Sequence, residues 1–427
     1  MVLDEVNLKL VSSVSLLIAV LMLSSCGGIK TTDSVFPATS NVCASSASQK
    51  RFIVNWEDGR VTLENGSSPE DFREGFVSKN LALIKHVDQD RRAQFIKPQS
   101  EIQTHAGEDV SAQSLNWGPQ QIDAPAVWAS GVEGSGVIVG VVDGMVDTSH
   151  SQLANNILVN PSEVANNGKD DDGNGFVDDV RGIQVNADKN DPMVNRHGSH
   201  VAGIIVADPN QGPVQGVAPR AKVVPAQFIS NDGGGSIGDA IIALNYVASR
   251  GAKVINMSWG LDPCIEVPSL RSTLAALNSR GILLITAAGN GDARGVGVNM
   301  DVTPAFPSAY NFANQLNVAA STINKVLVGF SNYGVKNVHV AAPGVGIYST
   351  TPLNQIETMS GTSMAAPMVA GAAALLWSAV PNATAAQIKQ ALVKSVERPP
   401  VLLNVSSGGI INVYDALQSL KTTVAVP

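Results

Sequence analysis

Long apolar runs are the feature of this chain that most restricts its fold. Residues 136–142 read Gly-Val-Ile-Val-Gly-Val-Val, a pattern typical of a strand buried on both faces of a parallel sheet. Similar runs recur at residues 221–229, 253–257, 282–287 and 316–319, and helical patterns lie between several of them, notably at 237–249 and 269–280. This alternation predicts an α/β fold, a doubly wound and mainly parallel sheet with helices on both faces.

Two polar residues stand where predicted strands end. Asp143 directly follows the first run, and Asn290 closely follows the fourth. In doubly wound sheets the residues that carry function lie at the carboxyl ends of the strands. Asp143 and Asn290 are therefore candidate site residues.

Ser363 lies at the N-terminal edge of an Ala-rich apolar stretch that is long enough for a buried helix. A helix N-terminus offers unpaired N–H groups and a positive dipole end. Such donors suit a hydroxyl that attacks a carbonyl, because they stabilise the oxygen that becomes negative. Taken alone, however, a Ser at this place is a helix cap.

A second apolar helix is predicted to open at His197, in the stretch His197-Gly-Ser-His200-Val-Ala-Gly. Two His at positions i and i+3 can hold a metal ion, but no third ligand of the usual type is near in the sequence. A general base for a Ser nucleophile, steadied by a buried carboxylate, is the better use of His197.

Four motifs together resemble those of the subtilisin-like serine peptidases, in the chain order Asp, His, Ser. They are Val-Val-Asp143, His197-Gly-Ser-His-Val-Ala-Gly, Ala287-Ala-Gly-Asn290 and Gly361-Thr-Ser363-Met-Ala-Ala-Pro, within a match over residues 115–418. The resemblance implies a serine endopeptidase acting on polypeptides, with Ser363 as nucleophile and His197 as general base and then acid. Asp143 would orient His197, and Asn290 would donate to the oxyanion beside the Ser363 N–H.

The same resemblance implies the substrate-binding residues. Ser258, Trp259 and Gly260 match the family's Ser-x-Gly strand, and Gly234 and Gly235 match the edge that faces it. Between these edges an extended peptide would be held by backbone hydrogen bonds. Small residues would line the primary pocket, namely Ala287, Ala288 and Gly289. The alternative for each Gly is an ordinary turn.

Two positions depart from the family pattern. The family has Asp-Ser/Thr-Gly where this chain has Asp143-Gly144-Met145, so a hydroxyl that commonly supports the Asp is absent. Met368 stands where the family commonly has a His. Neither change touches the three predicted catalytic residues. An inactive relative that binds peptides or partners remains the alternative function. A hydrolase of esters or lipids would be expected to show a Gly-x-Ser-x-Gly elbow, which is absent around Ser363.

An Asp-rich stretch between Asp143 and His197 predicts a structural Ca²⁺ site. Acidic and amide side chains recur at every second residue and Gly175 allows a sharp turn, as in a calcium loop. The predicted ligands are Asp170, Asp172, Asn174, the Phe176 carbonyl and Asp178. Arg181 at the twelfth position rules out a complete EF-hand, but the stretch resembles the Asp-rich calcium insertion of some subtilisin-like peptidases. The alternative is a solvated acidic loop.

The N-terminus predicts export and a lipid anchor. Residues 11–23 are apolar but shorter than the about 20 residues that span a bilayer, as in the core of an export signal. They lead to Leu23-Ser24-Ser25-Cys26, which resembles the bacterial lipobox. We expect a signal peptide at 1–26, lipidated at Cys26, and a flexible tether at 27–50. The protein would then be an outer-membrane lipoprotein of the cell envelope, or otherwise a secreted one.

The remaining residues divide into two predicted parts. Residues 51–114 would form a small α/β pro-region and linker, with strands at 51–55, 81–87 and 93–97. A helix would begin after Ser68 and run to about Lys79. Residues 115–427 would form the peptidase domain, which the family resemblance implies is inhibited by its own pro-region. The net charge is −8 with Lys and Arg scattered, which argues against nucleic acid as a partner.

Overall fold

The structure is a computed structural model that describes residues 30–36, 47–95, 115–185, 196–230, 233–261, 266–400 and 403–424. The predicted signal peptide with Cys26, and residues 96–114 of the predicted pro-region and linker, lie outside the described residues. The chain divides into two compact units. The smaller unit comprises residues 1–40 and 49–89, and the larger comprises 41–48 and 90–427.

The smaller unit is built on the antiparallel pair β1 (Ala47–Trp56) and β2 (Val61–Asn65), with β3 (Ile84–Phe95) on the other side of β1. Its helical segment runs through α3 (Pro69–Phe72), the π-helix η1 (Arg73–Val77) and α4 (Ser78–Asn80), and a short helix α2 (Thr32–Val35) precedes β1. Ser68 caps the helix by accepting a hydrogen bond from the Asp71 N–H, which confirms the predicted start. Phe52 and Phe72 stack in the core with ring centroids 4.1 Å apart.

Two predictions for this segment are wrong. The tether expected at 27–50 contains α2 and the start of β1, and Val35 and Phe36 are buried in the core of the smaller unit. The strands expected at 81–87 and 93–97 form a single strand, β3. The polar run Asp88-Gln89-Asp90-Arg91-Arg92 interrupts the apolar pattern and is typical of a loop. Asp90, however, is fully buried and accepts a hydrogen bond from the Gly238 N–H at 2.9 Å. A tertiary contact therefore keeps this polar run extended.

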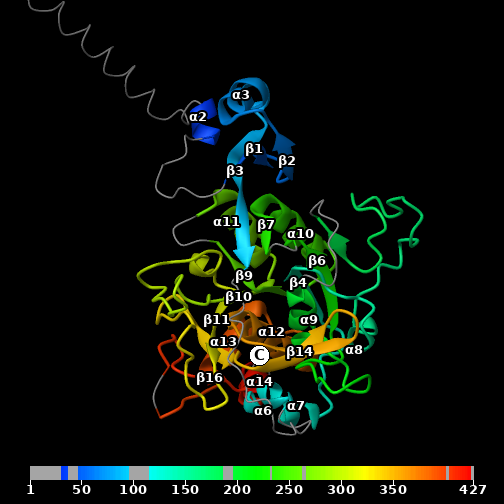
Figure 1. Ribbon diagram of the computed structural model, residues 1–427, viewed down its shortest axis with the longest axis vertical. Coiled ribbons are helices and arrows are strands. Elements are labelled where there is room, and N and C mark those ends of the chain that lie inside the picture. The colour runs from blue at the N-terminus through cyan, green and yellow to red at the C-terminus, as the bar shows by residue number, and fades with distance from the viewer. Residues whose placement is uncertain are drawn as a thin grey trace, which may run out of the picture. The chain divides into compact units, whose positions relative to one another are not determined.

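The larger unit contains a nine-stranded sheet that confirms the predicted α/β class (Figure 1). Its ladders from β5 to β16 are parallel, and the ladder between β15 and β16 is antiparallel. The strands in spatial order are β15 (Val396–Glu397), β16 (Ile410–Ile411), β12 (Val340–Pro343), β11 (Gln315–Ser321), β10 (Leu283–Ala287), β8 (Val254–Met257), β4 (Ile138–Asp143), β6 (Lys222–Gln227) and β5 (Ile183–Gln184). Each predicted buried run supplies one of these strands.

Two groups of helices cover this sheet. Helix α10 (Ile237–Ser249) packs on β4, β6 and β8 and against α11 (Pro268–Ser279). Helix α12 (Thr362–Ala379) packs on β8, β10, β11 and β12 and against α9 (His197–Val206). Among the described residues α12 is the one helix long and apolar enough to cross a membrane, but 89% of it is buried in the unit. It is therefore the core helix of this fold.

Shorter elements complete the larger unit. The helices are α6 (Trp117–Gln121), α7 (Ala124–Trp128), α8 (Ser151–Ala154), the 3₁₀-helix η2 (Ser308–Tyr310), α13 (Ala385–Lys394) and α14 (Val413–Val424). The remaining strands are the hairpin β13 (Ile347–Thr351) and β14 (Gln355–Met359), and the short strands β7 (Gly234–Ser236) and β9 (Trp259–Gly260).

Candidate active site

The fold brings Asp143 and His197 into contact. Asp143 is the last residue of β4 and His197 the first of α9, and both are buried. The distance from His197 Nδ1 to Asp143 Oδ1 is 2.7 Å. Because an ionised carboxylate only accepts hydrogen bonds, Nδ1 carries the proton. The Nε2 atom of the neutral imidazole is then the basic one, as a general base requires.

The two carboxylate oxygens of Asp143 have different surroundings. Oδ1 also accepts a hydrogen bond from the Gly144 N–H at 2.6 Å, whereas Oδ2 is buried and has no hydrogen-bond partner among the described residues. Gly144, which replaces the family's Ser or Thr, brings no hydroxyl to this carboxylate. At the other departure, Met368 is buried and lies so close to Gly118 that a Cβ there would be 2.4 Å from its methyl carbon.

Ser363 is the second residue of α12 and is fully buried. Its hydroxyl donates to the Ser258 carbonyl at 3.2 Å, and the Ser258 hydroxyl donates to the Ser363 carbonyl at 3.0 Å. This reciprocal pair ties the start of α12 to the segment between β8 and β9. To react, the Ser363 hydroxyl must exchange the Ser258 carbonyl for His197 as its acceptor.

The orientation of Asn290 is set by Thr362, a residue that the sequence analysis missed. Asn290 Oδ1 accepts hydrogen bonds from the Thr362 N–H and hydroxyl, both at 2.9 Å. The Thr362 hydroxyl in turn accepts one from the Gly289 N–H at 3.1 Å. Since its oxygen is engaged in this way, Asn290 presents Nδ2 toward Gly361, where a Cβ would lie 3.0 Å from it. The signal in the sequence was the Thr of Gly-Thr-Ser.

The two predicted substrate edges hold a strand of the chain itself. Residues of β3 pair antiparallel with β7 on one side, where Ala93 lies opposite Gly235 and Gln94 opposite Gly234. They pair antiparallel with β9 on the other side, where Gln94 lies opposite Gly260. A Cβ on Gly235 would lie 2.4 Å from the Phe228 carbonyl oxygen. This glycine therefore allows a close backbone approach and is not simply a turn residue.

The three other predicted binding residues differ in what they can offer. The Trp259 side chain is fully buried, donates to the Val142 carbonyl at 2.9 Å and packs edge-on against Phe228, so only its backbone can meet a substrate. Ala288 is 2% exposed. Gly289 has φ of +108°, and a Cβ there would lie 2.4 Å from the Asn332 amide nitrogen.

His200 is a structural residue. It is fully buried, and its Nε2 lies 3.0 Å from the Ile347 carbonyl oxygen and 3.1 Å from that of Glu357. Burial, and secondarily the charge of His197, lowers the pKa of His200 to about 3. It is therefore neutral and joins α9 to the β13–β14 hairpin. A metal site on His197 and His200 is not supported, because among the described residues this pair does not belong to a group of three possible metal ligands.

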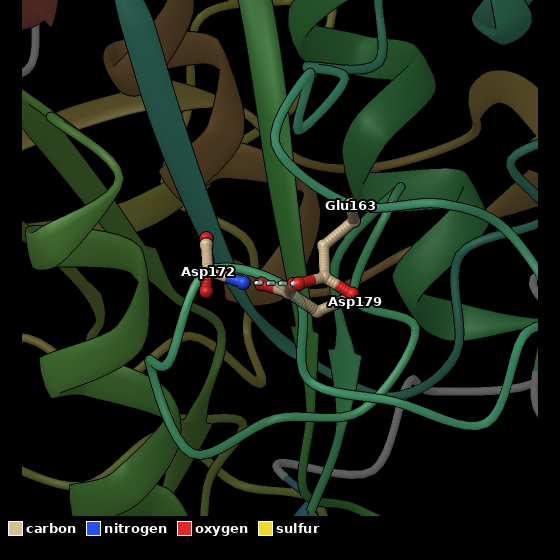
Figure 2. Close-up of side chains that lie close together, drawn as sticks. All are labelled: Glu163, Asp172 and Asp179. Atoms are coloured by element: carbon tan, nitrogen blue, oxygen red, sulfur yellow. Dashed lines mark hydrogen bonds between the residues drawn. The ribbon is translucent and has the colours of Figure 1, made fainter.

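Acidic side chains gather in the insertion between β4 and α9, in a different set from the predicted one. Glu163, Asp172 and Asp179 each offer a carboxylate oxygen, and these oxygens lie within 4.8 Å of one another (Figure 2). Asn160 Nδ2 donates to Asp172 at 2.9 Å and to Asp179 at 3.0 Å. Glu163 is 7% exposed, and its Oε2 has no hydrogen-bond partner among the described residues.

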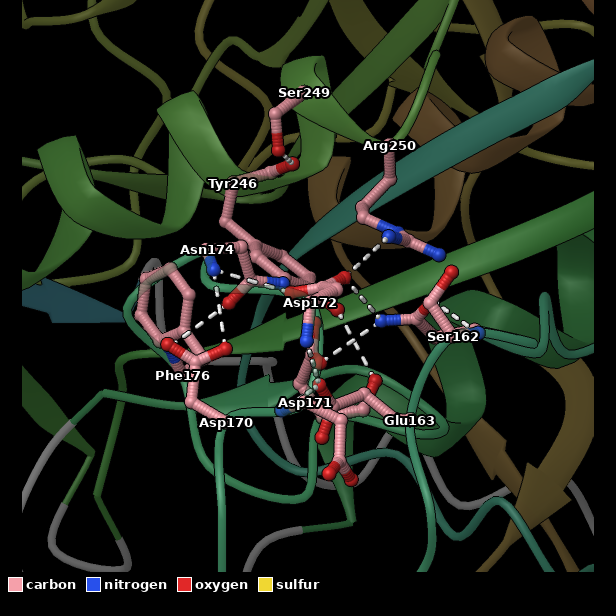
Figure 3. A network of polar contacts seen from close by, with 12 residues as sticks. Ser162, Glu163, Asp170, Asp171, Asp172, Asn174, Phe176, Tyr246, Ser249 and Arg250 are labelled. Atoms are coloured by element: carbon pink, nitrogen blue, oxygen red, sulfur yellow. Dashed lines mark hydrogen bonds and ion pairs between the residues drawn. The ribbon is translucent and has the colours of Figure 1, made fainter.

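Of the predicted ligands, only Asp172 belongs to this cluster. Asp170 accepts hydrogen bonds from the N–H groups of Asn174 and Gly175, which turns the loop back on itself. Asp178 accepts from the N–H groups of Asn167 and Gly168. Asn174 donates to Asp179 and accepts from the Phe176 N–H (Figure 3). Regular spacing suggested these residues, but the side-chain oxygens of Asp170, Asn174 and Asp178 accept hydrogen bonds from N–H groups of the loop.

The family can now be assigned. A model of the subtilase family matches residues 134–413, a range that includes Asp143, His197 and Ser363. The chain belongs to the subtilase family. It is 34% identical over 301 residues to subtilisin BL of Lederbergia lenta, covering 70% of this chain and 98% of that protein. It is 32% identical over 306 residues to thermitase of Thermoactinomyces vulgaris, covering 71% and 96%.

Other matches cover less of the matched protein. Subtilisin-like protease 1 of Plasmodium vivax is 33% identical over 303 residues, which are 67% of this subtilase but only 48% of the relative. The crystal structure of fervidolysin from Fervidobacterium pennivorans, described as a keratinolytic enzyme related to subtilisin, matches with a TM-score of 0.70 and 20% identity, covering 92% of this subtilase and 64% of that chain. The structural likeness to fervidolysin supports the assignment of the fold. Family and relatives together make this subtilase a serine endopeptidase.

Proposed function

We propose that this subtilase cleaves polypeptides through an acyl-enzyme on Ser363. The observation that carries the proposal is the buried 2.7 Å contact between His197 and Asp143. Ser363 is the second residue of α12, which packs against α9. His197 Nε2 takes the Ser363 proton as Oγ attacks the scissile carbonyl. The resulting imidazolium is stabilised by Asp143. The proton then passes to the leaving amine, and water hydrolyses the ester by the same steps.

The oxyanion of the tetrahedral intermediate needs donors already in place. Asn290 supplies Nδ2, because Thr362 engages its oxygen. The N–H of Ser363, in the first turn of α12, is a group that has no partner within the helix. The two donors and the nucleophile thus come from one helix start and one strand end. This arrangement favours an active enzyme over an inactive peptide-binding relative.

Active-site labelling tests the proposal. A fluorophosphonate should label the purified mature protein at Ser363 with a stoichiometry near one, and casein hydrolysis should be lost in parallel with labelling. Mass spectrometry of the labelled peptide identifies the residue. Folded protein that hydrolyses no casein and takes up no label would instead favour the inactive, peptide-binding alternative.

We further propose that residues 51–97 act as an inhibitory pro-region. The support is the backbone pairing of Ala93 and Gln94 with Gly234, Gly235 and Gly260, since these are the edges that a substrate backbone would occupy. Asp90 adds a buried carboxylate at the N-terminus of α10, where the helix dipole favours negative charge. A purified segment of residues 49–98 should inhibit the mature enzyme. A mature form that keeps residues 51–97 at full activity would make them a permanent domain.

We propose Ca²⁺ as the structural cofactor, held by Glu163, Asp172 and Asp179. The donor set fits a hard cation, because it consists of oxygens only. The buried Glu163 Oε2 has no other partner among the described residues, and a buried charge is costly unless it is paired. All three carboxylates belong to the insertion, and Arg250, which directly follows α10, lies 3.7 Å from Asp172 (Figure 3).

Removal of Ca²⁺ should lower the melting temperature of fluorophosphonate-inactivated protein. At free Ca²⁺ of about 100 times Kd, binding adds about 2.7 kcal/mol to the folded state, or about 5 °C in a domain of this size. Glu163→Gln should lower the melting temperature and respond less to chelator, whereas Glu266→Gln, an exposed carboxylate, should behave as the parent. Equal melting temperatures with excess Ca²⁺ and excess chelator would rule the site out.

We also propose export and lipidation at Cys26, supported by the apolar run at 11–23 that ends in a lipobox-like sequence. The Cys26→Ala variant should leave the membrane fraction and lose incorporation of labelled palmitate. Unchanged partitioning and labelling would contradict the anchor and leave soluble export.

A further inference from the structure

Lys389 and His339 form a contact that peptide hydrolysis does not use. Lys389 lies on α13, and His339 directly precedes β12. Lys389 Nζ is 3.2 Å from His339 Nε2 and 3.5 Å from the Phe312 carbonyl oxygen. His339 is 7% exposed and Lys389 is half-buried. Among the described residues no carboxylate forms an ion pair with Lys389.

The backbone of β11 determines which nitrogen of His339 carries the proton. The backbone N–H of Asn317 donates to His339 Nδ1 at 3.0 Å. The backbone N–H of His339 donates to the Asn317 carbonyl at 2.9 Å. Asn317 itself is fixed, because its buried side chain donates to the Ser308 carbonyl at 2.7 Å. Since Nδ1 accepts a hydrogen bond, the proton of the neutral ring is on Nε2.

This tautomer places the Nε2–H donor against Lys389. An ammonium group has three donors and no acceptor, so a protonated Lys389 would face His339 donor to donor. Moving the ring proton to Nδ1 would create the same conflict with the Asn317 N–H, because a backbone N–H is always a donor. The proton that can leave is that of Lys389. As a neutral amine, Lys389 accepts the hydrogen bond from His339 Nε2.

Burial acts in the same direction. It lowers the pKa of Lys389 to about 8, with no contribution from a charged group on any neighbouring element. Burial, and secondarily the charge of Lys389, lowers the pKa of His339 to about 3. The ring is therefore neutral at all working pH values. Near neutral pH a much larger share of Lys389 than of an ordinary Lys would therefore be neutral amine.

We propose that Lys389 is a modification site for small activated acyl groups, such as acyl phosphates or thioesters. The amine nitrogen attacks the acyl carbon, an N–C bond forms, and the phosphate or thiolate leaves with the bonding electron pair. The amine proton passes to the leaving group or to water, and the product is an amide. The amide oxygen can then accept the hydrogen bond from His339 Nε2, so the product retains the contact that selects the amine.

Acetylation rates measured against pH test this proposal. Full-length protein inactivated with a fluorophosphonate is treated with limiting acetyl phosphate from pH 6.5 to 10.5, and each lysine is quantified by peptide mass spectrometry. Lys394 is the internal reference, because it is exposed and lies on the same helix. At pH 7.5 Lys389 should react at least about tenfold faster than Lys394. Its rate should level off above about pH 8, whereas the rate of an ordinary lysine keeps rising to about 10.

A variant at His339 tests the proposed cause. In His339→Gln the amide oxygen can accept from an ammonium, so the midpoint of the Lys389 rate profile should move up relative to the parent. If this variant does not fold, the profile of the parent still decides. A parent midpoint at 10 or above would overturn the proposal, as would absence of Lys389 acetylation while Lys394 reacts.

Discussion

Ser363→Ala should lower kcat for peptide hydrolysis by about 10⁶, the loss that removal of the nucleophile causes in subtilisin. The hydroxyl is a weak nucleophile unless His197 takes its proton, and the neighbouring Thr362 hydroxyl is engaged with Asn290 Oδ1. KM should change little, because the backbone edges Gly234–Gly235 and Ser258–Gly260 are untouched. The measurement is steady-state hydrolysis of casein or a peptide by folded variant and parent.

The same variant separates mechanism from stability. Ser363→Ala removes the hydrogen bond to the Ser258 carbonyl but no helix cap, because the N-cap of α12 is Gly361, so the protein should still fold. Because Ser363 and His197 act as a unit, His197→Ala and the double variant should lose about as much as Ser363→Ala alone. If maturation is autocatalytic, Ser363→Ala should accumulate with residues 51–97 attached. Activity within about tenfold of the parent would remove Ser363 as the nucleophile.

The core of the fold could be predicted because its signals are local. The run at 136–142 became β4, and the predicted helix at 237–249 matches α10 from end to end. Ser236 caps α10 by accepting from the Asp239 N–H, and Gly251 follows it with a positive φ. Each of these features can be read from a few adjacent residues. The order of the strands in space was not among the predictions, because it depends on contacts between distant segments.

The features that were missed depend on such distant contacts. In the sequence Asp90 resembles a loop residue, but in the fold its carboxylate accepts a hydrogen bond from a buried N–H of α10. Glu163 lies seven residues before Asp170, outside the regular Asp spacing, and only the folded loop brings it to Asp172 and Asp179. Trp259 was predicted to hold substrate by its backbone, and the fold adds that its indole donates to the Val142 carbonyl in the core. Spacing in the sequence identifies the residue types of a site, while the hydrogen bonds decide which atoms remain for a ligand.

Both hydrogen bonds of the Asp143 carboxylate go to Oδ1. Replacement by Ala and replacement by Asn should therefore lower kcat by different amounts. Asp143→Ala should lower kcat by about 3 × 10⁴, as loss of the corresponding residue does in subtilisin. It removes the acceptor that holds the His197 tautomer and the charge that stabilises the imidazolium. Asp415→Asn, an exposed carboxylate on α14, should leave kcat unchanged.

Asp143→Asn should cost less than Asp143→Ala, because here the Gly144 N–H fixes which end of the amide is oxygen. That N–H donates to Oδ1, the atom that also accepts from His197 Nδ1. An amide nitrogen at this position would face the Gly144 donor, so the amide oxygen should occupy it and the nitrogen should take the place of Oδ2, which has no hydrogen-bond partner among the described residues. The His197 tautomer is then retained and only the negative charge is lost. The kcat of Asp143→Asn should therefore lie between those of the parent and Asp143→Ala, with KM unchanged in both variants. Equal losses of kcat in the two variants would show that the side-chain amide of the Asp143→Asn variant is rotated by half a turn, so that its nitrogen donates to His197 Nδ1. The Gly144 contact would then not control the tautomer.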